Sequence, residues 1–207
     1  MNSSIIDRIV ERAEAVLTRP PIEVEASGRH AHLSREAVDA LFGKGYALTK
    51  QADLSQPGQF SCKERVRVIG PKGEFPAVVV LGPERAETQI EISSTDAVAL
   101  GVPAIVRLSG DISGSAAARL VGPAGELRIE RGVIVAMRHI HMTPADAARL
   151  GIRDGRGVSA YIWSERSTTF KSVIVRVSPK FTTRMHIDYD EANACGFRKG
   201  MTALIEL

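Results

Sequence analysis

Hydrophobic residues beyond position 20 fall into short runs that alternate with polar turns. The runs are rich in β-branched and aliphatic residues, and turn signals such as "GPKG" and "GPAG" separate them. They read "RVRVIG", "AVVVL", "AIVRL", "VIVAM", "VSAYI", "SVIVRV" and "TALIEL". Seven or more short strands with few long helical stretches predict a mainly β fold, of the barrel or sandwich type.

The first 20 residues follow a different pattern. In "SIIDRIVERAEAVL" (4–17) the apolar residues recur at helical spacing and lie on one face, and "RPP" (19–21) ends the pattern. We therefore predict an amphipathic helix within residues 1–20. Such a helix either stands apart from the body as a targeting segment or packs on it.

One short pattern occurs four times along the chain. Each copy has a His or Glu, an apolar residue, a Ser, Thr or Asp, an acid close behind it, and a closing Gly. The copies are "HLSREAVDALFG" (32–43), "EISSTDAVALG" (91–101), "HMTPADAARLG" (141–151) and "HIDYDEANACG" (186–196). The pattern predicts a strand end, a capped helix of two turns and a glycine stop. His32, Glu91, His141 and His186 then occupy equivalent positions.

Four of the five histidines form two His-x-His pairs, "RHAH" (29–32) and "RHIH" (138–141). Residues i and i+2 of a strand point to the same face, about 6–7 Å apart. With one Glu and one further His, the pairs give six nitrogen or oxygen ligands and no thiolate. The candidate metal ligands are His30, His32, Glu91, His139, His141 and His186. Three ligands for each of two ions leave open positions, as in catalytic zinc sites; singly, such residues are more often caps or solvated polar groups.

Two further stretches have side chains suited to anions. Arg85 in "GPERAETQIEIS" follows a Gly-Pro turn, and its guanidinium can bind phosphate, although a loop arginine at the surface has the same appearance. Ser109 begins "SGDISGS", which is either an anion-binding loop or a hairpin loop. Cys62 and Cys195 lack metal or redox spacing and are interpreted as structural thiols, although Cys62 is also a candidate nucleophile.

Composition excludes several classes of protein. The chain has 207 residues, a net charge of +3, 5% aromatic residues and no clustered basic stripe, which argues against a nucleic-acid partner. No apolar run reaches the roughly 20 residues of a membrane span, and the charged N-terminus lacks a signal-peptide core. We expect an intracellular protein without nucleic-acid or membrane partners, whose mild positive charge suits small anions.

Taken in order, these motifs resemble those of one family, the phosphate propanoyltransferases of the propanediol-utilisation type. The resemblance covers residues 20–207 and rests on blocks that keep the family's order. These are "SGRHAHLS", "DLSQPGQF", "GPERAETQIEIS", "SGDISGS", "ERGVIVAMRHIHMTPADA" and "MHIDYDEAN". Members reversibly transfer a short acyl group, propanoyl or acetyl, from acyl-CoA to inorganic phosphate, which gives acyl phosphate and CoA.

The resemblance implies two β-barrels capped by short helices, with two zinc ions held by the six ligands given above. It implies that residues 21–48 and 137–207 form a discontinuous first barrel and that 49–136 form the second. It places phosphate on Arg85 and Ser109, with Arg85 as the catalytic residue. It also suggests a cytoplasmic enzyme inside a bacterial microcompartment, with residues 1–20 contacting shell or core proteins. The family pattern is compatible with a homo-oligomer.

The expected mechanism is direct attack of phosphate on the thioester at a dinuclear zinc site, without a covalent enzyme intermediate. Two other enzyme classes use similar ligands. A cupin-type oxygenase combines His-x-His with a Glu and a later His, but it binds a single metal and would give the second His-x-His pair no role. A binuclear hydrolase more often draws its ligands from a TIM barrel. A structural zinc protein is disfavoured because cysteine ligands are missing. The acyl-chain preference, the CoA-contacting residues and the oligomeric state are left open.

Overall fold

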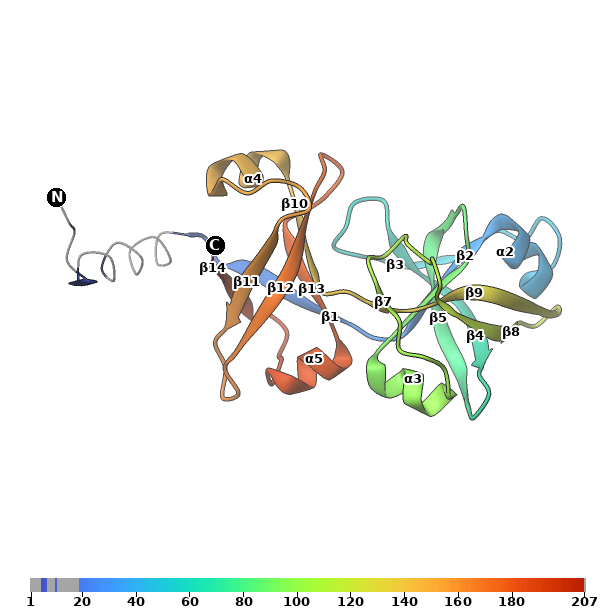
Figure 1. The fold of residues 1–207 in the computed structure, drawn as a ribbon. Coiled ribbons are helices and arrows are strands. Elements are labelled where there is room, and N and C mark those ends of the chain that lie inside the picture. Colours follow the sequence, from blue (N-terminus) through green and yellow to red (C-terminus); the bar gives the residue numbers. More distant parts are fainter. Residues whose placement is uncertain (1–4, 7–9, 11–18, 207) are drawn as a thin grey trace. The chain divides into compact units, whose positions relative to one another are not determined.

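The computed structural model describes residues 5–6, 10 and 19–206, and the chain divides into two compact units (Figure 1). Unit 1 comprises Met1–Ala26, Arg138–Ile187 and Glu191–Leu207, and unit 2 comprises Ser27–Met137 and Asp188–Asp190. Most of the predicted N-terminal helix lies outside the described residues, so it stays a prediction.

The strands of unit 1 form a closed barrel in the order β1-β13-β10-β12-β11-β14. The barrel closes because β14 pairs antiparallel with both β1 and β11. The strands are β1 (Ile22–Ser27), β10 (His139–Met142), β11 (Gly157–Ile162), β12 (Thr168–Val177), β13 (Arg184–Asp188) and β14 (Thr202–Glu206).

The strands of unit 2 run in the order β3-β4-β5-β2-β6-β9-β7, and β8 bridges β4 and β9. Through β8 the path β4-β5-β2-β6-β9-β8 also closes on itself, which makes a second six-stranded barrel. The strands are β2 (His30–Ser34), β3 (Lys50–Asp53), β4 (Phe60–Ile69), β5 (Glu74–Arg85), β6 (Gln89–Ile92), β7 (Val106–Arg107), β8 (Ala116–Val121) and β9 (Glu126–Ala136). The predicted fold class, two β-barrels with short helices, is therefore confirmed for the described chain.

Each repeated motif forms a strand followed by a short helix. The helices are α2 (Arg35–Phe42), α3 (Ser94–Leu100), α4 (Pro144–Leu150) and α5 (Tyr189–Ala194). At the first three, the side chains of Ser34, Ser93 and Thr143 accept a hydrogen bond from the backbone N–H three residues later, as an N-cap requires. Gly101 and Gly151 end their helices in the left-handed conformation. The predicted corner is confirmed at these sites.

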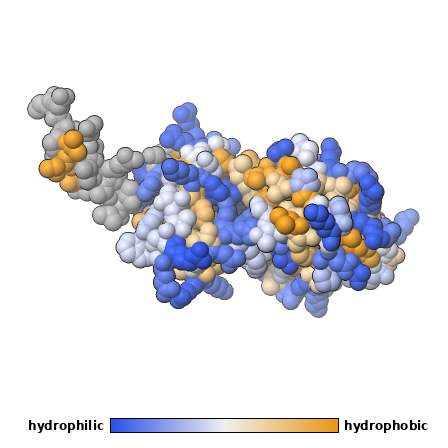
Figure 2. Space-filling model, turned by 60° about the horizontal axis from the view of Figure 1, so that its bottom comes forward, coloured by the Kyte–Doolittle hydropathy of each residue, from blue (hydrophilic) through white to orange (hydrophobic). Residues whose placement is uncertain are grey.

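Each unit has its own apolar core. The core of unit 2 is built from the inward side chains of its strands and from α2 and α3, and the core of unit 1 gathers residues from both ends of the chain. Hydrophilic residues cover much of the surface in Figure 2, and apolar residues reach it in patches. No helix of the described residues has the length and apolar character to cross a membrane.

The boundary of the discontinuous barrel differs from the expected one. Residues 30–48 were expected in the barrel with the C-terminal third, but β2 pairs with β5 and β6 of unit 2. Leu33, Ala37, Val38 and Leu41 accordingly belong to the core of unit 2. Of residues 21–48, only the segment that forms β1 joins the C-terminal strands, because its pairing partner β14 lies there.

Candidate active site

The first candidate group lies on two neighbouring strands of unit 2. His30 and His32 stand on the same face of β2, which pairs antiparallel with β6, and the register sets Glu91 directly opposite His30. All three side chains are buried. The ligand atoms of the three lie within 4.8 Å of one another, which is close enough for one metal ion to contact all of them.

The Glu91 carboxylate lies between the two imidazoles. Its Oε2 is 3.5 Å from His30 Nε2, and its Oε1 is 3.7 Å from His32 Nε2. His30 Nδ1 lies 2.8 Å from the Gly28 carbonyl, so this nitrogen donates and the lone pair of a neutral ring falls on Nε2. A lone pair facing a carboxylate oxygen requires a proton or a metal ion between them. The donor set therefore fits a divalent cation.

The electrostatics differ among the three side chains. Burial alone would lower the pKa of His30, but the Glu91 carboxylate outweighs it and raises that pKa. Burial would raise the pKa of Glu91, but His30, His32 and the hydrogen bond from Ser109 outweigh it and hold the pKa well below its usual range. Burial, then the positive charges of His30 and Arg85, lower the pKa of His32 well below its ordinary value. Glu91 and His32 are thus held in the forms that bind metal, and His30 would release its proton when an ion binds.

A hydrogen-bonded chain links this group to the predicted anion-binding residues. The Ser109 hydroxyl donates to Glu91 Oε1 at 2.6 Å and accepts from Arg85 Nη1 at 3.2 Å. The buried Gln89 amide donates to the same Glu91 oxygen at 2.6 Å. The structure thus brings Arg85 and Ser109 next to the first group.

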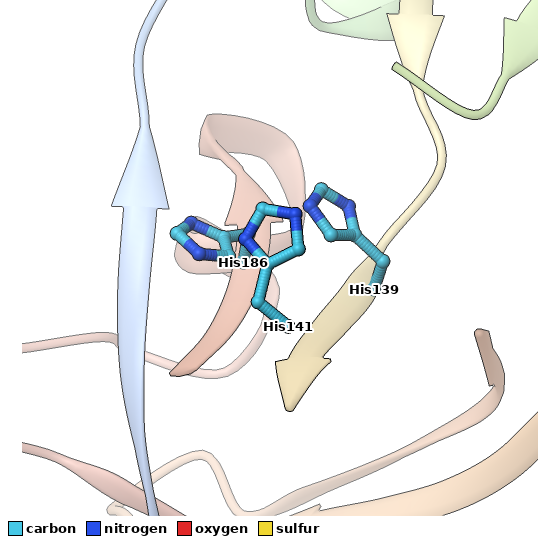
Figure 3. Close-up of side chains that lie close together, drawn as sticks. All are labelled: His139, His141 and His186. Carbon is cyan, nitrogen blue, oxygen red and sulfur yellow. The ribbon is translucent and has the colours of Figure 1, made fainter. Parts of the chain in front are cut away.

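The second candidate group lies on two strands of unit 1. His139 and His141 stand on the same face of β10, and the antiparallel register with β13 sets His186 directly opposite His139. The three rings gather together in Figure 3, with centroids 4.7 to 5.1 Å apart. Their nitrogens also lie within 4.8 Å of one another.

The surroundings of the second group differ from those of the first. His141 stacks on Phe181, with ring centroids 4.0 Å apart. The Glu25 carboxylate lies 3.7 Å from His186 Nδ1, where it can orient the ring. His139 and His141 are buried, and His186 is half-buried.

The two groups are built in the same way. In each unit the His-x-His strand pairs in parallel with one neighbour and antiparallel with another, and the antiparallel neighbour supplies the third ligand. All six predicted ligands therefore fall into two sets of three. Nitrogen and oxygen donors in threes, without thiolate, match zinc sites that keep a position open for substrate.

Two buried cysteines and one buried glutamine lie among the residues of the two units. Cys62 and Cys195 are buried, and burial raises the pKa of the Cys62 thiol to about 11, which suits a structural residue rather than a nucleophile. Gln89 is a site residue that sequence reasoning missed. Its signal was its spacing, two residues before Glu91 and hence on the same face of β6.

Comparison with known proteins gives a consistent result. A family model described as phosphate propanoyltransferase matches residues 23–198. Proteins of that name are similar to the chain over nearly its whole length. One from Clostridioides difficile is 55% identical over 94% of this chain and 95% of its own, and one from Listeria monocytogenes is 52% identical over 99% and 97%. One from Thermotoga maritima is 45% identical over 97% and 96%.

Proposed function

This chain belongs to the phosphate propanoyltransferase family and is therefore a phosphate acyltransferase, and we propose that it transfers a propanoyl or acetyl group reversibly between CoA and inorganic phosphate. One observation carries the proposal beyond the family name. Two sets of three metal-binding side chains stand on paired strands, and Arg85 is linked to one of them through Ser109.

We assign one zinc ion to each group. His30, His32 and Glu91 would hold one, and His139, His141 and His186 the other. A bound zinc ion supplies a Lewis acid toward carbonyl and phosphate oxygens. That both ions act at a single dinuclear site stays a prediction.

Arg85 binds the phosphate in this proposal. Its guanidinium always carries positive charge and offers a planar fork that matches two phosphate oxygens. The contact of Nη1 with Ser109 Oγ, at 3.2 Å, aims the side chain toward Glu91. Ser109 then takes part in phosphate binding by holding the guanidinium in place.

The reaction needs no covalent enzyme intermediate. Phosphate, held by Arg85, attacks the thioester carbonyl directly, and holding both reactants together supplies much of the rate. The CoA thiolate leaves without obligatory protonation, because a thiol pKa near about 8.5 makes it a tolerable leaving group. Cys62 takes no part, since its thiol is buried and protonated at neutral pH.

The direct test is thiol release from acetyl-, propanoyl- and longer acyl-CoA, each with and without phosphate. We expect release that requires phosphate, is lost on chelation and returns with zinc. Release independent of phosphate would indicate a hydrolase, and the proposal would fail. A single bound iron would instead favour the cupin alternative.

The role of Arg85 is tested by Arg85→Ala with Arg85→Lys as the matched control. Loss of a bidentate charged contact costs about 1.5–3 kcal/mol, so the KM for phosphate should rise about 10- to 100-fold in Arg85→Ala. The KM for acyl-CoA should change little. If Arg85→Ala kept near-normal turnover at low phosphate, Arg85 would not be the phosphate-binding residue.

We also propose that residues 1–20 direct the enzyme into a bacterial microcompartment. Support comes from the sequence, where the amphipathic pattern of 4–17 is separated from the barrels by "RPP". Deleting residues 1–18 should leave activity and solubility intact and abolish co-sedimentation with shell or core proteins. An unstable or insoluble truncated enzyme would instead indicate a helix that packs on unit 1.

A further inference from the structure

The buried amide of Gln89 belongs to the same face of unit 2 as the first ligand group. Gln89 and Glu91 are two residues apart on β6, and the register sets Gln89 opposite His32 and Glu91 opposite His30. The four side chains therefore occupy neighbouring positions on one face of two strands. Gln89 is only 1% exposed, so its amide meets protein groups rather than bulk water.

The hydrogen bonds of this amide fix its orientation. Its Oε1 accepts from the Gly110 backbone N–H at 2.9 Å, which only the carbonyl side of the amide can do. Nε2 must then face the other way, where it donates to Glu91 Oε1 at 2.6 Å and to Ser109 Oγ at 3.2 Å. If the amide were flipped, its NH₂ group would face the Gly110 N–H and its oxygen would face the Glu91 carboxylate. Both contacts are repulsive, so the flipped orientation is excluded.

Two donors consequently converge on one oxygen of Glu91. Gln89 Nε2 and the Ser109 hydroxyl each lie 2.6 Å from Oε1. The single Ser109 proton is used there, so the Ser109 oxygen is left to accept from Arg85 and from Gln89. The amide thus touches both the carboxylate and the hydroxyl that holds Arg85.

We propose that Gln89 is a positioning residue that sets the Glu91 carboxylate for metal binding and the Ser109 hydroxyl for Arg85. It acts through these two side chains, by anchoring them to the backbone at Gly110. The inference rests on the proposed function, because it takes His30, His32 and Glu91 as a metal site. Loss of a residue that orients a metal ligand typically lowers metal affinity about 10- to 100-fold.

The test compares Gln89→Met with Thr88→Val, both nearly isosteric. Thr88 is the adjacent buried residue, and its hydroxyl bonds to the backbone N–H and the hydroxyl of Ser34, not to Glu91. Both substitutions remove buried hydrogen bonds at the same end of β6, so each variant should melt at a lower temperature than the wild type. A purely structural role would make them alike in every other respect.

Zinc affinity separates the two roles. Titrating each metal-free protein against a chromophoric chelator, we expect two ions per chain in the wild type and in Thr88→Val, both with wild-type affinity. In Gln89→Met one ion should bind about 10- to 100-fold more weakly and the other unchanged. The KM for phosphate should also rise in Gln89→Met, because Ser109 loses a partner.

A second variant guards against a Gln89→Met protein that fails to fold. Gln89→Asn keeps an amide but is one methylene shorter, so it cannot span Gly110 and Glu91 together, and it should show the same weakened ion. Wild-type affinity for both ions in the folded variants would overturn the inference and leave the proposed function standing. A wild-type protein that binds no zinc would overturn the metal assignment itself.

Discussion

The two ligand groups share a strand arrangement but differ in charge and in support. The group of unit 2 pairs two imidazoles with a carboxylate that receives two hydrogen bonds and is buried throughout. The group of unit 1 has three imidazoles, and the Glu25 carboxylate lies 3.7 Å from His186 Nδ1. The strand pairing fixes the positions of the three ligands in each group. The ligand on the antiparallel neighbour, Glu91 or His186, then sets the charge of the site.

The difference in charge suggests a division of roles. With zinc bound, the group of unit 1 would carry one more positive charge than the group containing Glu91, because all of its ligands are neutral. The more positive site would stabilise developing negative charge better. The group of unit 2 is linked through Ser109 to Arg85, the residue proposed to bind phosphate.

Removal of one equivalent ligand from each group should have the largest effect. His30→Ala and His139→Ala take out the first ligand of each pair, and each protein should retain one zinc ion in metal analysis. Because a Lewis acid is worth several kcal/mol, kcat should fall by about 10³-fold or more in both. If either variant kept two ions per chain and full activity, its group would not be a catalytic metal site.

Glu91→His should give an intermediate effect. The change converts the first group into the ligand set of the second, so two ions should still bind, while the charge rises and Gln89 and Ser109 lose their acceptor. We expect kcat to fall about 10- to 100-fold. Glu91→Ala, as the control, should retain a single ion. Full activity of Glu91→His would show that the charge difference between the groups is immaterial.

The equivalent helix caps should respond alike. Ser93→Ala in unit 2 and Thr143→Ala in unit 1 each remove an N-cap hydrogen bond, which costs about 1 kcal/mol of the free energy of unfolding. Thermal unfolding of the metal-free proteins measures it. A loss confined to one variant would mean that the two corners are not energetically equivalent.

Asp146 should give the smallest effect, and one that depends on pH. The hydroxyl of Thr183, then that of Thr143 and the Arg149 guanidinium, outweigh burial and lower the pKa of Asp146. Its contribution is therefore fully present above its unfolded pKa of 3.8 and is lost as the pH falls through the lower folded value. Asp146→Asn should be less stable than the wild type at pH 7, by under about 1 kcal/mol. The difference should shrink in unfolding measurements below pH 4.

Local patterns in the sequence predicted local structure well. The strand runs, the caps at Ser34, Ser93 and Thr143 and the glycine stops depend on neighbouring residues, which the sequence displays directly. The repeat predicted equivalent positions for His32, Glu91, His141 and His186. It did not predict which ligands share a group, because that depends on the pairing of β2 with β6 and of β10 with β13.

Long-range pairing was harder to predict. The boundary near residue 48 was wrong because nothing local in "HAHLS" distinguishes a strand that pairs with β5 and β6 from one that pairs within the other barrel. Gln89 was missed for a related reason. Its importance depends on its register with His32 and on Gly110, 21 residues further along the chain.

The closure of unit 1 by β14 has a consequence for biosynthesis. Unit 2 consists of the continuous stretch 27–137 and only three later residues, Asp188–Asp190. Its barrel can therefore form while the ribosome is still translating the rest of the chain. The barrel of unit 1 must wait, because β1 finds its antiparallel partner only when Thr202–Glu206 emerge. Until then β1 and β11 are open sheet edges, and a premature stop before Thr202 would leave them exposed to aggregation.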